Sequence, residues 1–97
     1  MTLWVTKVPI TITKISAHRQ AGTSIVINIE HGLNPAAPGT NLWSSNQTVT
    51  AETSIDQTFD AFANADVAIN NVIKLEISTV TGSVAEAHVT IEYVEET

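Results

Sequence analysis

Hydrophobic and polar residues alternate along most of this chain, which is the spacing of a β-strand with one dry face and one wet face. The C-terminal stretch AEAHVTIEY alternates most regularly: Val89, Ile91 and Tyr93 share one parity, and His88 and Thr90 share the other. The stretches SIVINIE and NVIKLEIST repeat this alternation earlier in the chain. The inward positions of these three predicted strands form the predicted core, which comprises Ile25, Ile27, Ile29, Ile73, Leu75, Ile77, Val89 and Ile91.

Proline, glycine and changes of parity mark where the predicted strands end or bend. Pro9 cannot donate a hydrogen bond to a ladder, so it is expected at an edge or at a junction between strands. The parity changes within ITITKISA, which predicts a bulge near Thr13 and Lys14. QAGT predicts a turn around Gly22, and VTGS predicts a hairpin-type connection centred on Gly82.

The middle of the chain is expected to hold loops and short strands. HGLNPAAPGTN carries two prolines and two glycines and predicts a long surface loop. LWSSNQTVTAET and SIDQTFDAF each predict a short strand, the second with Ile55 and Phe59 inward and with Asp56 and Asp60 in solvent. ANADVAIN predicts a tight turn or a single helical turn. The count is seven or eight short strands and no amphipathic helix, which indicates an all-β antiparallel sandwich or barrel.

The length of 97 residues and the mass of 10.4 kDa indicate one domain, spanning residues 1–97. Size scaling predicts about 5,400 Å² of accessible surface for the folded monomer, so that about 64% of the unfolded surface is buried in one thin core. No cysteine is present to form a disulfide. Small domains without such staples often gain stability by association, and we therefore expect a symmetric homo-oligomer, a homotrimer. The low charged fraction of 14% suits buried subunit faces.

The charge balance bears on the class of partner. Four basic and ten acidic residues give a formal net charge of −6, and the four cations are scattered along the chain, so nucleic acid is not an expected partner. No segment approaches 18 consecutive apolar residues, so we expect no membrane span. The N-terminus lacks the features of a signal peptide, and synthesis in a cytoplasm is expected.

Candidate chemistry is sparse. His18 and His31 flank a predicted turn, and a metal site there would also need a carboxylate such as Glu30. The acidic residues between positions 56 and 66 lack the glycine and the distal glutamate of a calcium loop. The chain has no G-x-S-x-G motif, and a thin sandwich has little room for a deep pocket. We therefore expect no enzymatic activity, no catalytic residues, no cofactor and no metal.

The two tryptophans are the most informative side chains, because tryptophan is enriched at interface hot spots. Trp4, with Leu3 and Val5, lies in an apolar N-terminal segment ahead of Pro9. Either Trp4 packs on its own core, or residues 1–9 form an interaction arm that reaches a neighbouring subunit or partner. Trp43 follows the proline- and glycine-rich loop, and either anchors that loop or lines a ligand groove.

The order of these stretches along the chain resembles a known group of proteins. ITKISAHRQAGTSIVINIEHG precedes a proline- and glycine-rich loop and a threonine-rich middle, TFDAFANADVAINNVIKLEIST follows, and the chain closes with G-x-x-x-x-x-x-V-T-I-x-Y from Gly82 to Tyr93. This pattern resembles the small jelly-roll modules of tailed-bacteriophage virions, which are capsid decoration (cement) proteins and fibre-end domains.

The resemblance implies a jelly-roll sandwich, a homotrimer and no catalytic residues. It implies a protein made in the host cytoplasm that stabilises the phage head at the capsid surface by binding between subunits of the major capsid protein. The alternative is the tip of a phage fibre that binds a receptor or glycan, with Trp43 beside Asn41, Asn46 and Gln47. Fibre modules usually follow a long stalk, whereas this chain begins almost directly with a strand, which favours the decoration role.

Overall fold

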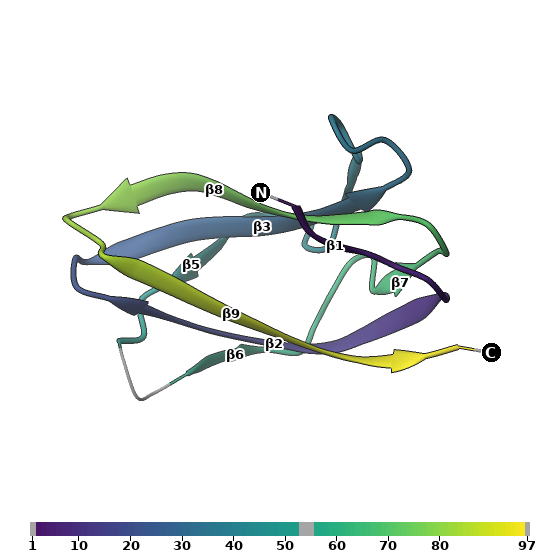
Figure 1. The fold of residues 1–97 in the computed structure, drawn as a ribbon. Coiled ribbons are helices and arrows are strands. Elements are labelled where there is room, and N and C mark those ends of the chain that lie inside the picture. Colours follow the sequence, from purple (N-terminus) through teal and green to yellow (C-terminus); the bar gives the residue numbers. More distant parts are fainter. Residues whose placement is uncertain (1, 53–55, 97) are drawn as a thin grey trace.

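A computed structural model describes residues 2–52 and 56–96, which form nine β-strands and no helix (Figure 1). Ile55, expected to point inward, lies outside these described residues. The structure has more strands than the seven or eight predicted, because Thr40–Asn41 and Asp66–Val67 each form a strand of two residues. The strands are β1 (Thr2–Val5), β2 (Ile10–Gln20), β3 (Ser24–Gly32), β4 (Thr40–Asn41), β5 (Gln47–Val49), β6 (Gln57–Phe59), β7 (Asp66–Val67), β8 (Val72–Thr81) and β9 (Glu86–Glu95).

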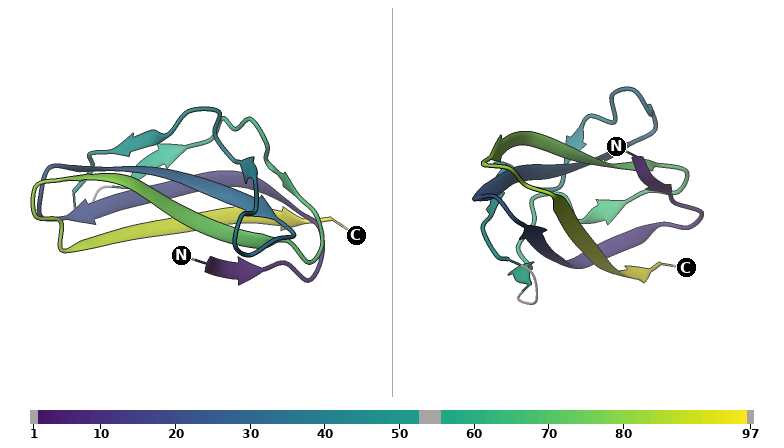
Figure 2. Two further views of the ribbon diagram at one scale, coloured as in Figure 1. Left: turned by 90° about the horizontal axis from the view of Figure 1, so that it is seen from above. Right: turned by 60° about the vertical axis from the view of Figure 1, so that its left-hand side comes forward.

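The strands form two sheets that face each other, so the predicted antiparallel sandwich is confirmed. One sheet has the order β1–β8–β3, with β4 and β5 both pairing the far edge of β3. In the other sheet β9 pairs one edge of β2, while β6 and β7 pair β2 as well. The named strand pairs are all antiparallel. Seen from above, β1 and β9 lie along one flank, and β5 and β6 lie along the opposite flank (Figure 2).

Two tight turns carry the chain from one sheet to the other. The turn after β2 contains Gly22 and the turn after β8 contains Gly82, and both glycines have positive φ angles, of 73° and 77°. The two turns pack together, since a Cβ on Gly82 would lie 3.1 Å from the Cα of Gly22. The turn around Gly22 is therefore confirmed. The connection at Gly82 differs from an in-sheet hairpin, because β8 pairs with β3 and β9 pairs with β2.

Local predictions along the first strands are confirmed. The register of β2 against β9 shifts between Ile12 and Lys14, which is the expected bulge, and Pro9 lies at the junction of β1 and β2. The bulge adds one residue to β2 and so reverses which parity points inward. For this reason Ile12 and Ile15, which have opposite parity, both face the core. Of the two structures expected for residues 63–70, the helical turn does not form, and a tight turn does form at Ile69 and Asn70. Residues 63–70 also contain β7, which pairs with the start of β2.

Most of the predicted core is confirmed. Ile25, Ile27, Ile29, Ile73 and Leu75 are all buried. The exception on the same ladder is Ile77, whose side chain is 47% exposed, so its assignment to the core was wrong.

The predicted core positions on β9 are only half-buried. Val89 and Ile91 pack against the core from its margin. The accessible surface of 5354 Å² is close to the size-scaling value, so the monomer is as compact as its length predicts. The exposure of Ile77 therefore reflects where the strands lie, and not a loosely folded chain.

Candidate interaction surface

One flank of the sandwich is closed by aromatic residues. Trp43, between β4 and β5, is 3% exposed and packs edge-on against Phe59 of β6, with ring centroids 5.3 Å apart. Phe62 lies 6.0 Å from the same indole. These contacts join the two sheets at their β5 and β6 edges, and we call this flank the Trp43 side.

Hydrogen bonds fix the loop that carries Trp43. The side-chain amide of Asn28 donates to the carbonyl oxygen of Trp43 at 3.0 Å and to the Asn46 side chain at 3.0 Å, and its oxygen accepts from the Trp43 N–H. Trp43 therefore anchors its loop, as one of the two interpretations expected. Because it is buried, it is not the exposed aromatic that the glycan-binding alternative requires.

The opposite flank is open, because inner-face side chains of β8 remain exposed there. Ile77 lies directly opposite Ile27, and Val80 lies directly opposite Ile25. Residues opposite each other on a ladder share one face of the sheet. Yet Ile25 and Ile27 are buried, whereas their partners Ile77 and Val80 are about half exposed, at 47% and 52%.

The facing strand β9 shows the same pattern. Tyr93 lies opposite the buried Ile12, and it is 44% exposed. Val89 and Ile91 lie opposite the buried Ala17 and Ile15, but are themselves only half-buried. We call the surface made by these inner-face residues of the two strands the open side, which comprises Ile77, Val80, Val89, Ile91 and Tyr93.

The open side exists because β8 and β9 are edge strands. Within the described residues, β9 pairs with β2 alone, and from Glu76 onward β8 pairs with β3 alone. Figure 1 looks onto this flank, with β1, β8 and β9 nearest the viewer. Exposed strand edges beside apolar side chains are the features of a surface that binds a further strand or subunit.

The N-terminal strand covers one end of the open side. β1 pairs with β8, with Val5 opposite Val72. Leu3 and Trp4 are half-buried against the core, and the Trp4 ring lies 5.5 Å from that of Tyr93. In this monomer, Trp4 thus packs on its own chain. Val5 is 40% exposed beside a groove of about 220 Å³ that runs between β1 and the end of β9.

The predicted pair of His18 and His31 does not come together, and His18 meets His88 instead. His18 and His88 stack on the outer face with ring centroids 4.6 Å apart, and His18 Nδ1 lies 2.6 Å from a carboxylate oxygen of Asp56. His31 lies near the other end of β3, where its Nε2 is 2.9 Å from the carbonyl oxygen of Asn64. Among the described residues, no group of three or more His, Asp or Glu side chains is arranged to hold a metal ion.

The acidic side chains named from the sequence are also separate from one another. Asp60 is exposed, as expected, and so is Asp56 beside His18. Asp66 accepts a hydrogen bond from Thr11 at 2.9 Å.

One carboxyl on the outer face of β8 has a shifted pKa. A side-chain hydrogen bond with Glu30 and the nearby Lys74 ammonium hold the pKa of Glu76 below its usual value.

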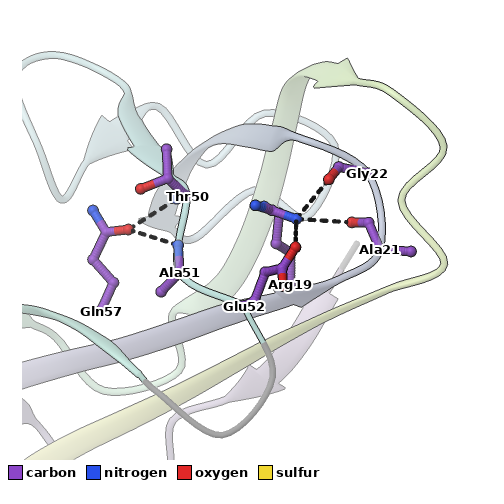
Figure 3. Close-up of polar contacts among 7 residues, drawn as sticks. All are labelled: Arg19, Ala21, Gly22, Thr50, Ala51, Glu52 and Gln57. Atoms are coloured by element: carbon purple, nitrogen blue, oxygen red, sulfur yellow. Dashed lines mark hydrogen bonds and ion pairs between the residues drawn. The ribbon is translucent and has the colours of Figure 1, made fainter.

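A buried arginine holds the end of the sandwich where the chain changes sheets (Figure 3). Arg19 is 7% exposed, and its Nη1 donates to the carbonyl oxygens of Ala21 and Gly22 and to Glu52 Oε1, at 3.1, 2.7 and 3.1 Å. The sequence analysis counted Arg19 only as a scattered cation. Its parity, which is shared with Ile15 and Ala17, was the signal that it faces inward.

Comparison of the chain with protein-family models, with curated proteins and with solved structures found no match. The described part of the chain contains no helix that is long and apolar enough to span a membrane.

Proposed function

We propose that this protein is a non-enzymatic structural component of a phage virion, a capsid decoration protein that stabilises the head by binding between capsid subunits as a symmetric homo-oligomer, a homotrimer. The observation that carries this proposal is the open side, where inner-face residues such as Ile77 and Tyr93 are about half exposed beside unpaired strand edges. Exposed apolar side chains beside unpaired strand edges are typical of interaction sites in proteins.

The jelly-roll topology is part of the proposal. It is supported by the nesting of the strand pairs, in which β2 pairs β9 in one sheet while β3 pairs β8 in the other. The two cross-sheet turns at Gly22 and Gly82 pack against each other at one end of these pairs. Such folding of a long double strand over itself produces the Greek-key connections of double-sheet jelly rolls.

The capsid contact is assigned to the N-terminal strand. Val5 is exposed at the groove beside Tyr93, and β1 lies at the edge of its sheet. An edge strand with an apolar side chain can extend a partner sheet. Several copies of a weak contact, presented by one oligomer, become long-lived through multivalency.

The test uses phage heads that have been stripped of decoration protein. Val5→Asp places a charge in the proposed contact and leaves the packing of Trp4 in place, and we expect it to lower the occupancy of the heads at least about tenfold. Leu33→Asp is the matched control, since Leu33 is 75% exposed on the loop after β3, two strands away from Val5 in the same sheet. Equal binding of both variants and the wild type would exclude the N-terminal strand as the capsid contact. No binding by the wild type would exclude the decoration role.

The fibre-tip alternative lacks its expected aromatic, because Trp43 is buried. A glycan array with the wild type and Tyr93→Ala separates the two roles, since Tyr93 is the exposed aromatic of the open side. Specific glycan binding that Tyr93→Ala abolishes would replace the decoration role with the fibre-tip role.

A further inference from the structure

We infer that β9 is a self-association edge: two copies of this chain pair their β9 strands antiparallel about a twofold axis at Thr90, joining two four-stranded sheets into one. This inference does not depend on the virion role. It concerns which surface the chain uses to bind a second copy of itself, and in which register.

The first argument is that β9 is a long edge with no further strand paired to it in the described part of the chain. It runs for ten residues, Glu86–Glu95, and pairs with β2 along its whole length. Natural proteins blunt exposed edges with proline, lysine and other charged side chains, bulges or a covering segment, and the charges of β9 are its three glutamates. β9 contains no proline, glycine or lysine, and the irregularity in its ladder lies on the β2 strand.

The second argument is that charge selects one register. If Thr90 lies opposite Thr90 of the partner subunit, then Glu92 lies opposite His88 of the partner subunit, and Glu86 lies opposite an apolar valine, Val94. The two neighbouring registers that keep the same faces together are worse. One centres on Ile91 and places Glu86 opposite Glu96, and the other centres on Val89 and places Glu86 opposite Glu92. Like charges directly opposite each other destabilise a strand pair.

The third argument comes from the inner face in the same register. Tyr93 lies opposite Ala87 of the partner subunit, and Val89 lies opposite Ile91 of the partner subunit. A large side chain therefore meets a small one, and two half-buried aliphatic side chains meet each other. Cross-strand pairs of this kind stabilise a sheet, and they cover part of the open side.

These pairings also indicate why the occupant is a second copy. A chain with a net charge of −6 repels itself over most orientations. In this register, however, Glu92 faces His88 of the partner subunit and Glu86 faces Val94 of the partner subunit, so neither meets a like charge directly opposite. Within its own chain Glu92 lies 3.5 Å from Lys14 and Glu86 lies 2.9 Å from His88, and the new pairing adds to these contacts. The complementarity lies within one sequence read in opposite directions, which is the property of a twofold interface.

Single cysteines test the register directly, because the natural chain has none. Thr90 is exposed, and at the twofold axis Thr90→Cys brings two sulfurs within disulfide range. We expect Thr90→Cys to form disulfide-linked dimers at least about a hundredfold faster than Thr79→Cys, an exposed control on β8. Glu86→Cys and Val94→Cys should cross-link when mixed, and neither should do so alone. Cross-linking of Thr90→Cys no faster than the control, or of Glu86→Cys with itself, would overturn the register.

Sedimentation and a charge exchange supply the second test. The β9 contact joins two chains, so combined with the proposed homotrimer it gives a hexamer, and the mass from sedimentation should be six times that of the chain. If the homotrimer does not form, the mass should be twice that of the chain. A monomer, or a trimer that does not pair further, would overturn the β9 contact. His88→Glu should raise the dissociation constant about tenfold, because it sets glutamate opposite Glu92 in both halves. Adding Glu92→Lys should restore the affinity. An unchanged dissociation constant in His88→Glu would contradict the proposed pairing, whatever the outcome of the capsid assay.

Discussion

The two flanks of this sandwich differ in how the margin of the core is covered. Each sheet has an inner face of isoleucines that must be covered where the sheet ends. On the Trp43 side, short strands and a hydrogen-bonded loop bring three aromatic rings over the margin of the core. On the open side, β8 and β9 end the sheets with nothing of this chain beyond them over much of their described length, and Ile77 and Tyr93 remain exposed.

The difference shows that burial in a small sandwich depends on neighbours as well as on parity. Ile27 and Ile77 face each other on one ladder, yet one is fully buried and the other is 47% exposed. The first has strands on both sides, and the second lies on an edge. The chain thus covers its core on one flank and leaves inner-face side chains exposed on the other.

The largest expected effect comes from introducing a charge at each member of this pair. Ile27→Asp buries a carboxylate without a partner, which costs several kcal/mol, so we expect loss of cooperative unfolding. Ile77→Asp leaves its carboxylate in water, and we expect a stability change within about 1 kcal/mol. Thermal unfolding followed by circular dichroism measures both. If Ile77→Asp also abolishes the transition in a monomeric sample, the open side is covered by the chain itself.

The next comparison truncates one aromatic on each flank. Trp43→Ala leaves a cavity in the closed margin, which typically costs about 3–5 kcal/mol. The buried indole N–H has no hydrogen-bond partner among the described residues, so its removal relieves one cost, and we expect the lower end of that range. Tyr93→Ala should cost the monomer about 1 kcal/mol, because 44% of Tyr93 is already exposed. Urea unfolding at low protein concentration measures both, and equal losses would mean that the flanks do not differ.

How far the sequence could predict this molecule follows from the same distinction. Alternation along SIVINIE and NVIKLEIST identifies which residues point inward, because strand geometry is local. Whether an inward residue is covered depends on the neighbouring strand in space, and no local pattern shows that β8 and β9 are edges. The sequence therefore placed Ile77 in the core with Ile27, and it could not show that Trp43 closes one flank while Tyr93 stays on the other.

Arg19 illustrates the same limit for polar residues. Its inward parity was visible in the sequence, but its partners were not, because Ala21, Gly22 and Glu52 come together only through the cross-sheet turn and the loop after β5. A cation at an inward position ordinarily argues against a strand assignment. Here the sandwich ends at that point, and carbonyl oxygens of the turn accept its hydrogen bonds.

The smallest expected effect lies on the outer face of β8, where the open edge carries charge instead of apolar surface. The hydrogen bond with Glu30 and the ammonium of Lys74, 3.4 Å away, lower the pKa of Glu76 in the folded state. A carboxyl whose folded pKa is lowered stabilises the protein above its unfolded pKa, and this contribution is lost as the pH falls through the folded value. Glu76→Gln should therefore lower the Tm slightly at pH 7, and this difference should become smaller at acid pH, as the pH falls through the folded pKa of Glu76.

The pH profile separates this contribution from a loss of packing, which would be the same at both pH values. In a Lys74→Met background, the Tm difference that Glu76→Gln causes at pH 7 should become smaller, because part of the shift comes from the Lys74 ammonium. A difference that does not become smaller at acid pH, or that does not shrink in the Lys74→Met background, would show that Glu76 acts through packing on the edge strand. The outer face of β8 would then contribute to stability in the same way as its inner face, and the contrast between the two faces of this edge would be lost.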